Sequence, residues 1–91
     1  MTTRETTVKN KTGLHARPAS TFVETAAKFK SVIKIKNLDK DSAEVNAKSI
    51  IKILTLSMSQ GTNIRISAEG EDEVEAVDTL IELVDGGFGE L

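Results

Sequence analysis

Gly13-Leu14-His15-Ala16-Arg17-Pro18-Ala19 is the stretch in which the chain is predicted to pass from a loop into its first helix. Pro18 fits near the start of that helix, because a backbone N–H in the first turn has no intrahelical partner to lose. The apolar residues that follow recur at helical spacing on one face, and they are Ala19, Phe22, Val23, Ala26 and Ala27. This face predicts a helix that packs on a surface shared with the rest of the chain.

Several other segments alternate polar and apolar residues with the period of a half-buried strand. They are Ser31 to Lys36, the short run through Ala43, Val45 and Ala47, and Thr62 to Ala68. Glu5 to Asn10 is a weaker strand candidate, because few of its residues favour a strand. The polar turn Asn37 to Ser42 predicts that the first two of these strands form a hairpin.

Two further helices follow from the pattern. Ser49 precedes an apolar run and is predicted to be the N-cap of a short helix. The last helix begins with acidic residues, as the helix dipole favours, and ends at Gly86-Gly87. Its apolar face consists of Val74, Val77, Leu80, Ile81 and Val84. The order β-α-β-β-α-β-α predicts an α+β fold with an antiparallel sheet covered by helices on one face.

Length and composition narrow the function. Ninety-one residues, 38% of them hydrophobic and 29% charged, predict a single globular domain over residues 1–91. The chain has no cysteine, which excludes disulfides, a thiolate nucleophile and cysteine-based metal sites. A single histidine makes a zinc site unfavourable, and the acidic run Glu71-Asp72-Glu73-Glu75 is better explained as a solvated first turn than as a metal cluster. We therefore expect no metal and no cofactor.

Charge and hydropathy disfavour two classes of partner. The formal charge of -2 and the absence of Trp and Tyr argue against nucleic-acid binding, which depends on basic patches and stacking rings. No apolar run approaches the length of a membrane span. Met1 to Asn10 is polar and lacks the apolar core of a signal peptide, so we expect a cytoplasmic protein. Nothing in the sequence requires an oligomer, and a monomer is expected.

His15 and Arg17 are the strongest candidates for chemistry. A helix N-terminus offers unpaired N–H groups and a partial positive charge, which suit a phosphoryl group, and imidazole can carry phosphate covalently. The helix terminus and Arg17 both favour the neutral, nucleophilic ring. The backbone N–H groups of Ala16 and Arg17 could reach the phosphate, and the guanidinium could bind its oxygens. The alternative is an exposed loop histidine beside a solvated arginine, which any short His-x-Arg pattern allows.

Ser49 and the residues after it form a second candidate site. An N-cap serine has a structural role of its own, but a phosphate there would place negative charge beside an apolar surface. The four apolar residues of the short helix surround it too completely for all to be buried: Ile50, Ile51, Ile53 and Leu54. Exposed apolar patches often mark docking surfaces, although a generous contribution to the core explains the pattern equally well.

Two motifs resemble the HPr family, the histidine-containing phosphocarriers of the bacterial phosphoenolpyruvate-dependent sugar phosphotransferase system. The stretch Gly13 to Ser20 resembles that family's active-site signature, and Val45-Asn46-Ala47-Lys48-Ser49-Ile50 resembles its regulatory-serine signature. The ending Gly87-Phe88-Gly89-Glu90 is similar to the family's usual tail. The resemblance covers essentially the whole chain and implies an open-faced β-sandwich with strand order 1-4-2-3 and three helices on one face.

The same resemblance implies roles for individual residues and partners. His15 would accept phosphate at Nδ1 from Enzyme I and donate it to IIA domains of sugar transporters, and Arg17 would stabilise the phosphate. Ser49 would be the target of HPr kinase/phosphorylase in bacteria that have one. An apolar docking patch would consist of Ile50, Ile51 and Leu54. The chain departs from the family pattern in a longer turn at Asn37 to Ser42, in Lys52 where many members have a small residue, and in Ser57 where glycine is common.

Other functions remain open from the sequence. One is a regulatory binding module that acts through Ser49 on a transcriptional regulator or an enzyme. Another is the same phosphocarrier chemistry in the nitrogen-related branch of the system. The simplest is a small domain with no catalytic role, which leaves both signatures unexplained.

Overall fold

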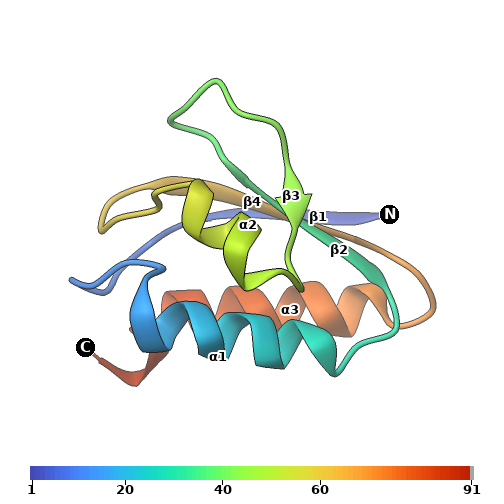
Figure 1. Cartoon of the computed structure of the whole chain (residues 1–91). Coiled ribbons are helices and arrows are strands. Elements are labelled where there is room, and N and C mark those ends of the chain that lie inside the picture. The colour runs from blue at the N-terminus through green and yellow to red at the C-terminus, as the bar shows by residue number, and fades with distance from the viewer. Residues whose placement is uncertain (91) are drawn as a thin grey trace.

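The computed structural model describes residues 1–90. Its elements are β1 (Thr2–Thr7), α1 (Ala16–Ala27), β2 (Val32–Asn37), β3 (Val45–Asn46), α2 (Ile50–Thr55), β4 (Asn63–Glu69), α3 (Glu73–Asp85) and the 3-10 turn η1 (Gly87–Gly89). The strands pair antiparallel in the order β1-β4-β2-β3, and the three α-helices lie to one side of this sheet (Figure 1). The predicted α+β fold and strand order are confirmed.

The core forms where the two central strands turn their apolar residues toward the helices. Ile33 and Ile35 of β2 lie opposite Ala68 and Ile66 of β4, and all four are buried. The helices cover this face with Phe22 and a stripe along α3 consisting of Ala76, Val77, Leu80 and Val84. Apolar residues recur every second position in the strands and about every 3.6 positions in the helices, which places them on one face of each element. These faces meet in a single layer between the sheet and the helices.

The first strand differs from the prediction. The sequence pattern placed it at Glu5 to Asn10, whereas β1 spans Thr2–Thr7 and contains no apolar residue. Its register is set by backbone pairing with β4, from Thr2 opposite Ala68 to Thr7 opposite Asn63. The prediction rested mainly on Thr6, Thr7 and Val8, and of these Val8 is buried just after the strand ends. Backbone pairing leaves no periodic signal in a polar strand, which explains the error.

Polar contacts fix β1 against α3. Thr2, Arg4 and Thr6 lie on the strand face that points toward the helix. Thr2 Oγ1 donates to Glu73 at 2.6 Å, Arg4 pairs with Asp78 at 2.9 Å, and Thr6 donates to Asp85. The acidic side of α3 therefore replaces the apolar packing that an edge strand ordinarily receives.

Three smaller predictions were wrong. Ala27 and Val74 were assigned to buried helix faces, but Ala27 is exposed and Val74 is 58% exposed. Ala27 lies in the last turn of α1 and Val74 in the first turn of α3. In these turns the apolar pattern of the sequence continues, but the side chains are not covered by the core. Ala43 was assigned to a strand but is exposed, because β3 contains only Val45–Asn46.

The end of α2 explains one departure from the family pattern. Leu56 caps the helix, and Ser57 follows with φ of 50°, in the left-handed region. That conformation favours glycine, because a Cβ is strained there. Ser57 therefore occupies a position that would be less strained with glycine.

None of the helices over residues 1–90 is long and apolar enough to cross a lipid bilayer.

Hydrogen-bonded carboxylates hold loops to the sheet and helices. Asp72 accepts hydrogen bonds from the Ser31 hydroxyl, from Lys30 N and from Ser31 N, and these lower its pKa, the hydroxyl contributing most. Asp39 accepts from the backbone and side-chain N–H groups of Asn63, which lower its pKa. Each of these carboxylates stabilises the fold in its ionised form.

Replacing Ser57 by glycine is expected to stabilise the protein. Relief of the left-handed strain outweighs the added entropy of the unfolded chain, for a gain of about 0.5–1 kcal/mol. Urea denaturation measures the free energy of unfolding. Ser20→Gly, at an exposed site within α1, is the control and should lose about 0.5 kcal/mol. Equal losses in the two variants would contradict this account of Ser57.

The free energy of unfolding should fall in acid because the folded protein lowers these carboxyl pKa values. Their contribution is complete above the unfolded values, 3.8 for aspartate, and is lost as pH falls through the lower folded values. Asp72→Asn should be less stable at pH 7 and lose less stability between pH 5 and pH 2. Glu71→Gln, which removes a neighbouring exposed carboxylate, is the control, and urea titrations across this range compare the variants. An unchanged acid dependence in Asp72→Asn would contradict the role of Asp72.

Candidate functional site

His15 lies at the N-cap of α1, immediately before the first helical residue. Its backbone is extended, with φ of -128° and ψ of 163°, and its side chain is half-buried. Among residues 1–90 no side chain caps this helix, and the amides of Ala16 and Arg17 occupy positions that have no intrahelical acceptor. The backbone places His15 directly before two N–H groups that are available to an anion.

Ala16 adds a feature that the sequence did not reveal. Its φ is 50°, although it is not a glycine and begins a helix. A left-handed alanine costs about 1–2 kcal/mol, and such strain persists only where the surrounding structure fixes the chain on both sides. On the helical side, Pro18 and Ala19 are buried.

The loop side is fixed by a close backbone contact with the segment that follows α2. Leu14 is buried, and its N–H donates to Met58 O at 2.8 Å. Gly13 has φ of 70°, and a Cβ at this position would lie 2.5 Å from Met58 O and 2.8 Å from Ser59 Cα. Only glycine fits there, so the residue two places before His15 is determined by this contact.

Asn10 completes the loop and was not among the predicted site residues. It is buried, its carbonyl accepts from Gly13 N at 3.1 Å, and its Nδ2 donates to Gly13 O at 3.0 Å. The same Nδ2 donates to Glu90 Oε1 at 3.0 Å. Asparagine at the first position of a turn and glycine at the fourth is a known turn preference, and this signal could have identified Asn10.

Arg17 is exposed and forms no ion pair with any carboxylate among residues 1–90. Lys11, in the loop before His15, is also exposed. An uncommitted guanidinium two residues after His15 can turn toward a phosphoryl group, because no carboxylate in the described structure holds it elsewhere.

Ser49 caps α2, as predicted. Its Oγ accepts from Lys52 N at 3.4 Å, and its side chain is half-buried. The turn before it is fixed by Asn46, whose carbonyl accepts from Ser49 N and whose Oδ1 accepts from Lys48 N. Lys48 Nζ donates to Phe29 O at 2.7 Å, which ties this turn to the end of α1.

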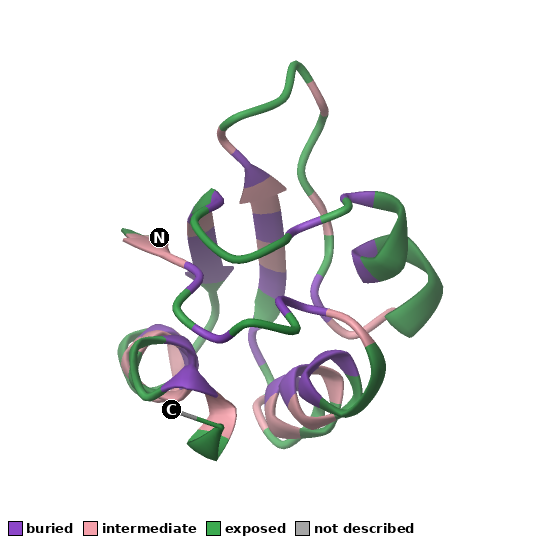
Figure 2. Cartoon of the chain, turned by 90° about the vertical axis from the view of Figure 1, so that its left-hand side faces the viewer, coloured by how far each residue is buried: buried purple, intermediate pink, exposed green. Residues whose placement is uncertain are grey.

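The short helix α2 exposes most of its apolar residues. Ile50 is 36% exposed, Ile51 71% and Leu54 42%, whereas Ile53 is fully buried. The prediction that the four apolar residues of this helix are not all buried is therefore confirmed. Helix α2 contacts α1, and the exposed turns of α2 and the first turn of α1 are both visible from one side of the molecule (Figure 2).

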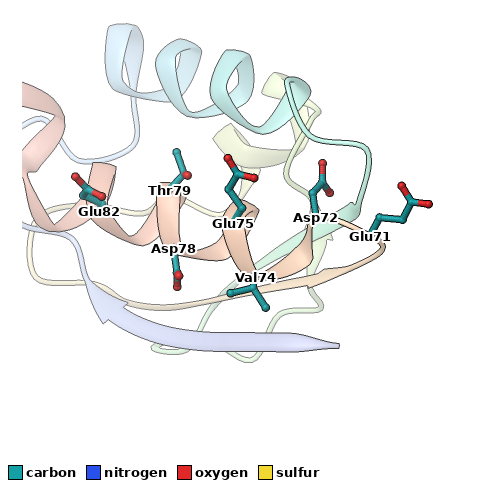
Figure 3. A pocket seen from close by; sticks show the side chains of 7 residues that line it. All are labelled: Glu71, Asp72, Val74, Glu75, Asp78, Thr79 and Glu82. Atoms are coloured by element: carbon teal, nitrogen blue, oxygen red, sulfur yellow. The ribbon is translucent and has the colours of Figure 1, made fainter.

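Acidic residues at the start of α3 and just before it surround a shallow hollow. The hollow is lined by Glu71, Asp72, Val74, Glu75, Asp78, Thr79 and Glu82. The side chains of Glu75 and Asp78 point to different sides of the helix (Figure 3). Within the described residues no group of three potential ligands is placed to hold a metal ion. The start of α3 lies at the opposite end of the molecule from the start of α1 (Figure 1).

Comparisons with known proteins agree with this geometry. The family model described as PTS HPr component phosphorylation site matches residues 2–85. The phosphocarrier protein HPr of Xylella fastidiosa (strain Temecula1) is 46% identical over 99% of this chain and 98% of its own. The HPr-like protein Crh of Bacillus subtilis is 45% identical over 88% and 91%. The multiphosphoryl transfer protein of Haemophilus influenzae is 43% identical over 92% of this chain, which spans only 17% of that protein's length.

Solved structures give the same result. The crystal structure of HPr-C-His from Thermoanaerobacter tengcongensis superposes with a TM-score of 0.93 and 50% identity, covering 100% of this chain and 99% of its own. An HPr dimer from the same organism has a TM-score of 0.76 and 54% identity, covering 91% and 92%. With the family model matching most of the sequence and the fold matching over all of it, the chain belongs to the HPr family of phosphocarriers of the bacterial phosphotransferase system.

Proposed function

We propose that this protein accepts a phosphoryl group on His15 from phosphorylated Enzyme I and passes it to IIA components of sugar transporters. The observation that carries the proposal is the position of His15 at the N-cap of α1, beside amides that have no intrahelical acceptor. The phosphocarriers to which this chain is similar support the same role.

The transfer needs little from the protein beyond positioning and charge. A lone pair of neutral His15, at Nδ1, attacks the phosphorus of the donor phosphohistidine. The donor's P–N bond breaks, and its electron pair returns to the donor ring. The N–H groups of Ala16 and Arg17 donate to the phosphoryl oxygens, and the Arg17 guanidinium balances their charge. In the second transfer, a nucleophile of the IIA component attacks the phosphorus carried by His15. The P–N bond to His15 breaks, and its electron pair returns to the His15 ring.

Partners would dock on the apolar patch of α2. Ile50, Ile51 and Leu54 are all exposed there and can be covered by an apolar surface of Enzyme I or a IIA domain. Lys52 is exposed on the same helix and would favour partners with an acidic rim. The protein would act as a monomer, because only one partner at a time can reach His15. It would act in the cytoplasm.

A second role at Ser49 is supported by its place at the edge of this patch. A phosphate on Ser49, added by HPr kinase/phosphorylase where the host has one, would put negative charge beside Ile50 and Ile51. This would weaken docking of phosphotransferase partners. The alternative function is a regulatory module in which the phosphorylated patch binds a transcriptional regulator, and the similarity to Crh-named relatives keeps that function in view.

The carrier role predicts one acid-labile phosphoryl group after incubation with phosphoenolpyruvate and Enzyme I. Intact-mass spectrometry should show the added mass on the parent and none on His15→Ala. Arg17→Ala should be phosphorylated about 10 to 100 times more slowly, since it loses a charge-assisted contact to phosphate. Lys40→Ala, in the hairpin, is the matched control and should behave as the parent. Equal labelling of His15→Ala would contradict the proposal.

The docking role predicts that charge at position 49 weakens partner binding. Ser49→Asp should raise the dissociation constant for Enzyme I about tenfold, because an anion is placed against a desolvated apolar contact. Ser49→Asn retains a good N-cap without the charge and should bind as the parent does. Isothermal titration calorimetry measures both affinities. Unchanged binding of Ser49→Asp would remove the basis for regulation at this site.

A further inference from the structure

The C-terminal segment contacts the loop that carries His15. Glu90 Oε1 accepts a hydrogen bond from Asn10 Nδ2 at 3.0 Å, between residues 80 positions apart. The turn η1 brings Glu90 to this position. Gly87, Phe88 and Gly89 all have positive φ, and Glu90 N donates to Gly87 O at 2.9 Å. Phe88 packs against the core, which holds this strained turn in place.

We propose that Glu90 is a positioning residue for His15, and that the segment Gly87–Glu90 is a clasp that holds the phosphoacceptor loop through Asn10. A carboxylate can only accept hydrogen bonds, so Glu90 requires Asn10 to present its Nδ2. The second hydrogen of the same Nδ2 donates to Gly13 O at 3.0 Å. A reversed amide would place Asn10 Oδ1 against both of these oxygens, so Glu90 selects the orientation that closes the loop.

The side-chain amide of Asn10 has few other hydrogen-bond partners. Asn10 is fully buried, and its Oδ1 has no hydrogen-bond donor among residues 1–90. All the side-chain hydrogen bonds that Asn10 makes within the described structure therefore pass through Nδ2, to Gly13 and Glu90. A buried amide that loses a charged partner loses one of the stronger hydrogen bonds in the loop.

The effect reaches His15 through the backbone. Gly13 O and Leu14 N–H belong to the same peptide unit. Its carbonyl accepts from Asn10 Nδ2, and its N–H donates to Met58 O. The strained Ala16 follows His15 and needs fixed chain on both sides. Glu90 and Met58 thus hold the loop at two points, and loss of either lets the strain at Ala16 relax by moving His15.

Amide hydrogen exchange tests the clasp without any transfer reaction. In Glu90→Ala the amides of Gly13 and Leu14 should exchange about tenfold faster than in the parent, because a charge-assisted hydrogen bond is lost. The amide of Ile66, in the central strand β4, should exchange at the parental rate. Glu90→Gln keeps an acceptor oxygen and should restore most of the protection. Glu44→Ala, which removes an exposed carboxylate of the hairpin, is the matched control and should change nothing.

The kinetics of phosphoryl transfer provide a second test of the role of Glu90, and this test rests on the proposed phosphocarrier function. Glu90→Ala should lower the first-order rate of transfer from phosphorylated Enzyme I several-fold while KM for Enzyme I stays constant, because the α2 patch is untouched. Glu90→Gln should recover that rate.

Three results would overturn the proposal. They are parental exchange at Gly13 and Leu14 in Glu90→Ala, equally accelerated exchange at Ile66, and a Glu90→Gln variant as impaired as Glu90→Ala. If the parent accepted no phosphate at all, the proposed function would fail while the exchange experiment still decided the clasp.

Discussion

The site depends on one backbone contact, in which Leu14 N–H donates to Met58 O and Gly13 lies directly against the same carbonyl. This contact joins the loop before α1 to the segment after α2. It therefore fixes the loop that carries His15 relative to α2, the helix that Ser49 caps and that exposes the apolar patch. No side chain is needed at position 13, and any Cβ there would separate the two segments.

The strain at Ala16 follows from the same arrangement. The chain leaves the fixed Leu14, passes through the extended His15 and must enter a helix whose residues Pro18 and Ala19 are buried. A left-handed residue between these two fixed segments makes the turn. Two unfavourable backbone conformations, at Ala16 and Ser57, border the segments that meet at this contact. Packing of Leu14, Ile53 and Met58 in the core offsets their cost.

Much of the architecture could be predicted because it rests on apolar periodicity. Phe22 and Ala26 on α1, and Ile64 and Ile66 on β4, follow the helical and strand periods and are buried as expected. Strand β1 was predicted too far along the chain, at Glu5 to Asn10, because its six residues are polar and its position is set by pairing with β4. A contact of this kind depends on another segment of the chain and leaves no local pattern.

The same distinction applies to the candidate site. His15, Arg17 and the N-cap Ser49 were predicted because helix starts have recognisable chemistry. Asn10 and Glu90 were missed as a pair, since their contact spans 80 positions. The left-handed Ala16 was missed because alanine gives no signal of positive φ.

Comparison of Gly13→Ala with Gly61→Ala is the most direct test of the central contact. Both glycines have positive φ, but a Cβ at Gly61 would meet nothing within 4 Å. Both variants should retain protected β4 amides. Gly61→Ala should accept phosphate from Enzyme I as fast as the parent, whereas Gly13→Ala should accept it at least about tenfold more slowly, since His15 is displaced. Parental phosphorylation of a folded Gly13→Ala would contradict the claim that this backbone contact builds the site.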